Sequence, residues 1–351
     1  MAAVLHQLAL LRERFENPVM ERELRSRMRG GRSYLITGGY TLLVGICVLI
    51  VYSQVPATAS ALAMGEVASR TGRAIWTWGC CVQAVLLPLM VPAFTCGAIT
   101  LERERDLLEL LLLTRQSPAQ ICLGKLGSGA GLGLMLVFAS VPVLSLSVVL
   151  GGVAPMEMVA TVCVLTSGVV AAGALGLVVS SLCMRTMNAT WIAYLIAGGA
   201  IVGFPVITSL MGQARAMQET GSEWAVLVTL LAFIFAALPP AAALSLVTSR
   251  IGRKPGAEPR SRVWWLATIG GWWCLFALLM YVPPVQAVLF QGQLLTFFHP
   301  ISAILGVMEP GYARSNPVIP HLWWMCSLLY LGLAAWFILV ATLRVRALRS
   351  A

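Results

Sequence analysis

Long uncharged apolar segments alternate with short charged segments along most of the chain. Eight of the apolar segments reach the ~20 residues that a helix needs to cross the hydrocarbon core of a bilayer. We therefore predict an all-α polytopic membrane protein with about eight transmembrane helices. The predicted spans are residues 34–54, 74–100, 126–151, 157–183, 189–211, 223–249, 263–282 and 321–343.

The segment with the densest charge, Leu101 to Lys125, lies between the second and third predicted spans. Its first part, from Glu102 to Thr114, predicts one continuous helix, because strong helix formers follow early acidic residues and neither Gly nor Pro occurs. Leucines make this helix apolar on most sides, so it needs cover from the bilayer surface, from its own bundle or from a docked protein. The mixed charges at its start would form a polar rim around such a contact. A solvated charge run at a helix end is the alternative interpretation.

Residues 5–32 carry apolar side chains at intervals of three to five positions, which is the pattern of a helix with one apolar face. We predict two helices here. Asn17 would cap the second, Pro18 would take its first position, and Gly30 and Gly31 would end it. Seven arginines close to the first span favour a position on the cytoplasmic membrane surface. A solvated helical arm is the alternative.

Positive charge is concentrated on one side of the predicted bundle. Eight spans bring both termini to the same side, and 20 of the 24 Lys and Arg residues fall there. Because Lys and Arg collect in cytoplasmic loops, we expect both termini and the charged segment in the cytoplasm.

Residues 283–320 predict an interfacial or re-entrant helix pair on the outer face, broken by His299 and Pro300, with a ninth span as the alternative. We predict four parts: interfacial helices at residues 1–33, a six-span core at 34–250, a linker at 251–262 and a C-terminal two-span unit at 263–351.

Composition narrows the functional classes. Hydrophobic residues make up 59% of the chain and charged residues 11%, which excludes a soluble globular protein. The net charge of +10 then reflects membrane topology, and we expect no nucleic-acid partner. The predicted spans carry no charged residue deep inside, which argues against an ion-driven carrier. Gln83 or Asn188 could still serve a neutral solute.

Patterns typical of catalysis or cofactor binding are missing from the sequence. The nine cysteines form no C-x-x-C pair, and the three histidines lack a metal-ligand spacing. Gly124-Lys125 is followed by Leu126, so the phosphate-binding loop sequence is absent. We therefore predict that the chain is not an enzyme and binds no cofactor or metal itself.

Small residues and prolines mark close approaches and bends. Gly127 with Gly131, and Gly168 with Ala172 and Gly176, have the four-residue spacing of small residues that lets two helices approach closely, either within the bundle or in a dimer. Pro88 and Pro92 predict a kink of the second span next to the charged segment, and are hinge candidates.

Several sequence elements together resemble a known family, the permease subunits of ABC-2-type ABC transporters. The elements are Asn17-Pro18-Val19, Glu23-Leu24-Arg25, Pro92-Ala93-Phe94-Thr95, Glu102-Arg103-Glu104-Arg105, Leu108-Glu109-Leu110-Leu111, Thr114 and Gly124-Lys125. The resemblance covers residues 17 to about 250. The chain departs from it at Asp106-Leu107, where many relatives have Gly-Thr, and at Arg115, where they have Pro.

The resemblance implies a permease subunit that couples ATP hydrolysis by a separate subunit to export by alternating access. Its partners would be two ABC ATPase subunits, which bind ATP and Mg²⁺, a second identical or related permease subunit, and membrane lipid. Its location would be the bacterial inner (plasma) membrane. The residues expected to form the ATPase-coupling helix are Glu102, Arg103, Glu104, Arg105, Asp106, Leu108, Glu109, Leu111, Leu112 and Thr114.

Two further expectations follow from the resemblance. The link from Met184 to Asn188 would be a second, smaller cytoplasmic contact. Glu102→Lys or Glu109→Lys would detach or uncouple the ATPase and leave the membrane fold intact. A membrane scaffold that anchors a partner complex without moving cargo is the alternative function.

Overall fold

The computed structural model describes residues 18–28, 31–54, 64–113, 116–203, 299–308 and 322–349. Within these residues every regular element is helical and there is no strand, so the all-α prediction is confirmed there. The helices are α2 (Pro18–Met28), α3 (Gly31–Ser53), α4 (Met64–Thr95), α5 (Gly97–Glu104), α6 (Leu108–Leu112), α7 (Pro118–Leu150), α8 (Pro155–Leu182), α9 (Thr186–Gly198), the π-helical turn η1 (Gly199–Gly203), α15 (Pro300–Met308) and α17 (Leu322–Arg349).

Five helices in the described part of the chain are long and apolar enough to cross a membrane, and the chain is therefore a multi-pass membrane protein. Predicted span 189–211 is helical as far as it is described, in α9 and η1. Predicted spans 223–249 and 263–282, and the linker at 251–262, lie outside the described residues. The five helices are α3, α4 with its continuation α5, α7, α8 and α17, on predicted spans 34–54, 74–100, 126–151, 157–183 and 321–343.

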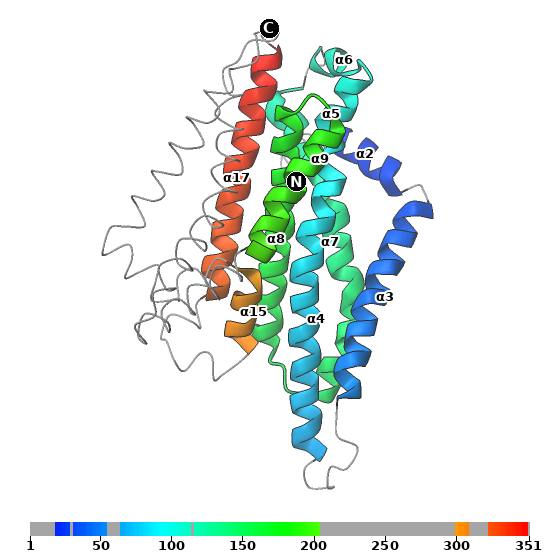
Figure 1. Cartoon of the computed structure of the whole chain (residues 1–351), viewed down its shortest axis with the longest axis vertical. Helices are drawn as coiled ribbons and strands as arrows, with labels where there is room; N and C mark the ends of the chain where they lie inside the picture. The colour runs from blue at the N-terminus through cyan, green and yellow to red at the C-terminus, as the bar shows by residue number, and fades with distance from the viewer. Residues whose placement is uncertain are drawn as a thin grey trace, which may run out of the picture.

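The long helices form one bundle with α4, α7 and α8 packed together at its centre (Figure 1). Helix α3 packs against α4 and α7, and α17 packs along α8 and part of α7. In α8 the run from Ala171 to Ala174 is buried, and such small side chains let neighbouring helices approach closely. The short helix α15 comes from the segment predicted as an outer helix pair. It packs against α4, α8 and α17, and His299 at its start is buried.

Helix α2 lies at the α5–α6 end of the bundle and packs against α7 (Figure 1). It begins at Pro18 and ends at Met28, before the Gly30-Gly31 pair, as predicted. The predicted first helix of this region lies outside the described residues.

Helix α7 begins at Pro118, well before the predicted start of the third span at residue 126. Ser117 and Gln120 form a capping box: the Gln120 N–H donates to Ser117 Oγ at 3.2 Å, and the Ser117 N–H donates to Gln120 Oε1 at 2.9 Å. Because of this cap, Lys125 lies inside the helix instead of in a loop.

The predicted continuous helix from Glu102 to Thr114 is wrong, because α5 ends at Glu104 and α6 begins only at Leu108. The Leu107 N–H donates to Glu102 O at 2.9 Å, and the Asp106 N–H donates to Arg103 O at 3.2 Å. Asp106 itself is left-handed, with φ 55°. These are the two hydrogen bonds and the backbone turn of a Schellman helix end, where glycine is the usual residue.

Candidate functional site at the α5–α6 junction

Helix α5 starts as a separate helix directly after α4, and α8 holds its first turn. The first N–H groups of a helix have no partner within the helix. Here Ser180 Oγ of α8 accepts the Ile99 N–H at 3.0 Å and the Thr100 N–H at 3.1 Å. The Thr100 hydroxyl donates to Cys96 O at 2.9 Å, across the break between the two helices.

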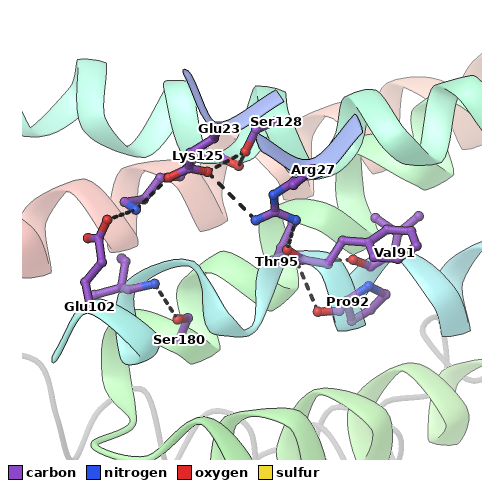
Figure 2. Close-up of polar contacts among 11 residues, drawn as sticks. Glu23, Arg27, Val91, Pro92, Thr95, Glu102, Lys125, Ser128 and Ser180 are labelled. Carbon is purple, nitrogen blue, oxygen red and sulfur yellow. Dashed lines mark hydrogen bonds and ion pairs between the residues drawn. The ribbon is translucent and has the colours of Figure 1, made fainter. Parts of the chain in front are cut away.

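A buried ion cluster, made of Glu23, Glu102 and Lys125, joins α2, α5 and α7 (Figure 2). The Lys125 side chain is 1% exposed, and its Nζ lies 2.9 Å from Glu23 Oε1 and 2.7 Å from Glu102 Oε1. Ser128, three residues further along α7, donates its hydroxyl to Glu23 Oε2 at 2.7 Å. A charge this deeply buried is stable only when opposite charge faces it. The two carboxylates provide that charge, and so fix the three helices to one another.

Arg27 connects the ion cluster to α4. Its Nη2 lies 3.8 Å from Glu23 Oε2, and its Nη1 donates to Phe94 O in the last turn of α4. Burial lowers the pKa of the Arg27 guanidinium from its usual value, and the nearby Glu23 carboxylate raises that pKa and so offsets part of the effect.

The next two residues of α5 contact different helices, because consecutive positions on a helix point about 100° apart. Arg103 Nη1 donates to Cys183 O, directly after the end of α8. Glu104 accepts the Thr186 N–H at 2.7 Å and the Thr186 hydroxyl at 3.0 Å, and so caps the start of α9. Glu102, Arg103 and Glu104 therefore hold α5 against α2, α7, α8 and α9.

The turn after α5 and the helix α6 present an exposed apolar surface at this end of the bundle. We call Leu107, Leu110 and Leu113, which lie directly before, within and directly after α6, the α6 leucines; Leu110 is 63% exposed and Leu113 80% exposed. Arg105 and Asp106 are exposed beside them. Exposed leucines rimmed by charge mark contact surfaces for proteins or membranes.

The sequence-predicted coupling residues thus lie in three different environments. Glu102, Arg103 and Glu104 were expected to form a polar rim facing a partner, but each has an ionic or hydrogen-bond partner in this chain. Arg105 and Asp106 are exposed in the turn. In α6, Leu108 and Leu111 are partly buried, and Glu109 and Leu112 belong to the same helix; Thr114 lies outside the described residues.

In the predicted second contact, between Met184 and Asn188, Met184, Arg185 and Met187 are exposed. Arg103 Nη1 lies 3.5 Å from Met184 Sδ, so this link lies next to α5. The hinge candidates Pro88 and Pro92 lie inside α4, which ends three residues after the second proline.

The glycines identified from sequence lie mostly at close contacts within the bundle. A Cβ on Gly127 would lie 2.7 Å from Met20 Sδ, and one on Gly131 would lie 3.6 Å from a methyl of Leu24, so these two glycines face α2. A Cβ on Gly176 would lie 2.0 Å from Thr95 Oγ1 of α4. These contacts favour packing within the bundle over a dimer interface at Gly127, Gly131 and Gly176.

Gly168 differs from these three glycines, because it does not lie at a close contact: a Cβ there would meet nothing within 4 Å.

Six residues that complete the site were not among the predicted site residues: Glu23, Arg27, Lys125, Ser128, Ser180 and Thr186. Lys125 had a signal in the sequence, since it is a lysine next to a long apolar run and a buried amine needs acidic partners. Thr186 lies in the link from Met184 to Asn188, which the family resemblance marks as a contact. Ser180 had no signal, because small hydroxyl residues are common inside apolar helices.

The described residues contain no group of three or more His, Cys, Asp or Glu side chains that could hold a metal ion. No protein-family model matches the chain, and no match to it was found among curated proteins.

Proposed function

We propose that the chain is the transmembrane permease subunit of an ATP-driven exporter of the ABC-2 type, and that α6 receives motion from a separate ATPase subunit. The observation that carries this proposal is that the α5–α6 junction has two kinds of contact. The α6 leucines offer an apolar docking surface, while Glu102, Arg103 and Glu104 bind α5 to four other helices. A displacement of α6 by a docked protein would therefore be transmitted to much of the bundle.

The backbone of the junction also supports the family resemblance. Many relatives have glycine at the position of Asp106, and Asp106 adopts the left-handed conformation that glycine adopts most easily. This departure from the family pattern keeps a backbone shape that the family residue favours.

In the proposed assembly two ATPase subunits bind ATP and Mg²⁺, and two permease subunits, identical or related, enclose the cargo path. Both termini lie on the cytoplasmic side of the bacterial inner membrane. Closure of the ATPase pair moves both α5–α6 junctions, and the two states differ in their contacts with cargo, which is the requirement for any ligand-driven change.

The first test is to extract the full-length chain in mild detergent and identify the proteins that copurify with it. We expect an ATPase. Both proteins are then reconstituted in vesicles, and backbone hydrogen exchange of residues 97–104 and 186–198 is measured with and without ATP. A change of exchange on ATP addition supports transmission through α5. A partner that lacks ATPase activity would refute the proposal.

The same measurement separates the exporter from a membrane scaffold. A scaffold uses the α6 leucines as a docking surface but transmits no motion. Stable binding of the ATPase with identical hydrogen exchange in both conditions would therefore favour the scaffold over the exporter.

A further inference from the structure

A groove of about 950 Å³ runs between α3 and α4, outside the junction described above. This volume is near the upper end of the ~300–1,000 Å³ range of small-molecule sites. At the end nearer α6 its walls are apolar and include Leu43 and Ile46 of α3 and Val82 and Leu86 of α4.

The opposite end of the groove is polar. Gln54, Arg70 and Thr71 line it there, at the ends of α3 and α4 that lie away from α6 (Figure 1). Arg70 is exposed and pairs with Glu66 one turn earlier, at 2.6 Å. Exposed pairs of this kind are weak, so the guanidinium can also bind an anion. The groove thus has one polar end that offers an arginine side chain, and a long apolar body, which suits an amphiphile whose head can bind a guanidinium.

The length of the groove matches one leaflet of a bilayer. At ~1.5 Å per residue, its lining extends roughly 16 Å along α3, from Leu43 to Gln54, and roughly 28 Å along α4, from Val67 to Leu86. One leaflet with its headgroups is about 20 Å thick, half of the ~40–45 Å of a whole bilayer. A partner helix from a second protein would cross the whole membrane and would not require this one-leaflet polarity.

We propose that this groove binds one phospholipid of the leaflet opposite α6. Its phosphate contacts Arg70 and Gln54, and an acyl chain lies between α3 and α4. Arg70 supplies charge-assisted hydrogen bonds to phosphate, for which the guanidinium is well suited. This site does not depend on the proposed function.

The test uses the full-length protein in detergent, with palmitoyl-oleoyl phosphatidylglycerol as the probe and native mass spectrometry as the readout. We expect one tightly held lipid per chain. Arg70→Gln should weaken its binding about tenfold, the size expected for one lost charge-assisted hydrogen bond. Arg70→Lys should keep most of the affinity. Because Arg70 is exposed, both variants should fold normally.

A second pair of variants tests the apolar body of the groove. Cys47→Trp places an indole at a groove-lining position, and Leu49→Trp places the same side chain at an exposed position of α3 outside the lining. We expect only Cys47→Trp to lower occupancy. Equal effects of both variants, or no effect of Arg70→Gln, would mean general annular lipid and would overturn the proposal. Disulfide formation between Cys47 residues of two copies, with no bound lipid, would assign the groove to a second copy of the chain and would overturn it as well.

Discussion

The ammonium of Lys125 lies 2.7 Å from the carboxylate of Glu102, although the two residues are 23 positions apart and belong to different helices. With Glu23 at 2.9 Å, this contact places one buried positive charge between two carboxylates. The most charged part of the sequence therefore holds the bundle together on one side and presents leucines to its surroundings on the other.

Lys125→Met should destabilise the bundle strongly. It leaves two partly buried carboxylates facing each other, with only Arg27, 3.8 Å from Glu23, as a nearby cation, and breaking a buried ion pair in this way costs roughly 3 kcal/mol. The free energy of unfolding of the full chain in detergent measures the effect.

The matched control replaces all three members of the ion cluster, as Glu23→Gln, Glu102→Gln and Lys125→Met together. This triple variant should regain part of the lost stability, because no carboxylate is left without its ammonium partner. Arg27 loses its pairing with Glu23 but keeps its hydrogen bond to Phe94 O. A single Lys125→Met variant as stable as the unmodified chain would show that the ion cluster does not hold the helices. Glu102→Lys is no longer expected to leave the fold intact, because it would place a second amine next to Lys125.

The hydrophobic pattern was sufficient to predict the long helices, because a membrane span needs only length and apolarity. The start of α2 at Pro18 was also predictable from local sequence. The contacts of Glu102, Arg103 and Glu104 were only partly predictable. Consecutive side chains on a helix point about 100° apart, so these three residues contact different helices and could not face one partner as a single polar rim.

The sequence could not predict which side chains of the same chain pair with Glu102, Arg103 and Glu104, because these pairs depend on how the helices pack. Glu23 lies 102 positions from Lys125, and no local pattern links them. The end of α5 was missed for another reason. Its left-handed residue is an aspartate, Asp106, and the usual glycine signal is absent.

Asp106→Gly should therefore stabilise the α5–α6 turn. A left-handed conformation costs an L-residue roughly 1 kcal/mol relative to glycine. Asp106→Ala keeps this strain and lacks the polar side chain that helps aspartate to tolerate it, so it should destabilise the turn. Thermal unfolding of the two variants gives opposite shifts if the turn is as described, whereas equal shifts would contradict it.

Gly129→Ala should destabilise the contact between α4 and α7, since the added Cβ would lie 2.3 Å from Thr95 Cγ2. Overpacking of this kind costs about 1–3 kcal/mol. Thr95→Ser removes that methyl group and should restore much of the stability in the double variant. Gly168→Ala, where nothing lies within 4 Å, is the control and should be neutral or slightly stabilising. Additive effects of Gly129→Ala and Thr95→Ser would show that the two residues do not touch.

The α6 leucines should matter for partner binding and hardly at all for folding. Leu110→Ser with Leu113→Ser removes apolar surface that is exposed in the described structure, so the free energy of unfolding should change by less than about 0.5 kcal/mol. If the ATPase covers these side chains, each leucine contributes about 1–2 kcal/mol to binding, and the double variant should bind at least tenfold more weakly. Titration calorimetry with the copurified ATPase measures this affinity.

Leu123→Ser, at a half-exposed leucine near the start of α7, is the matched control and should leave the affinity unchanged. Equal losses in both variants would mean that α6 is not the docking surface, because the effect would then follow general surface apolarity.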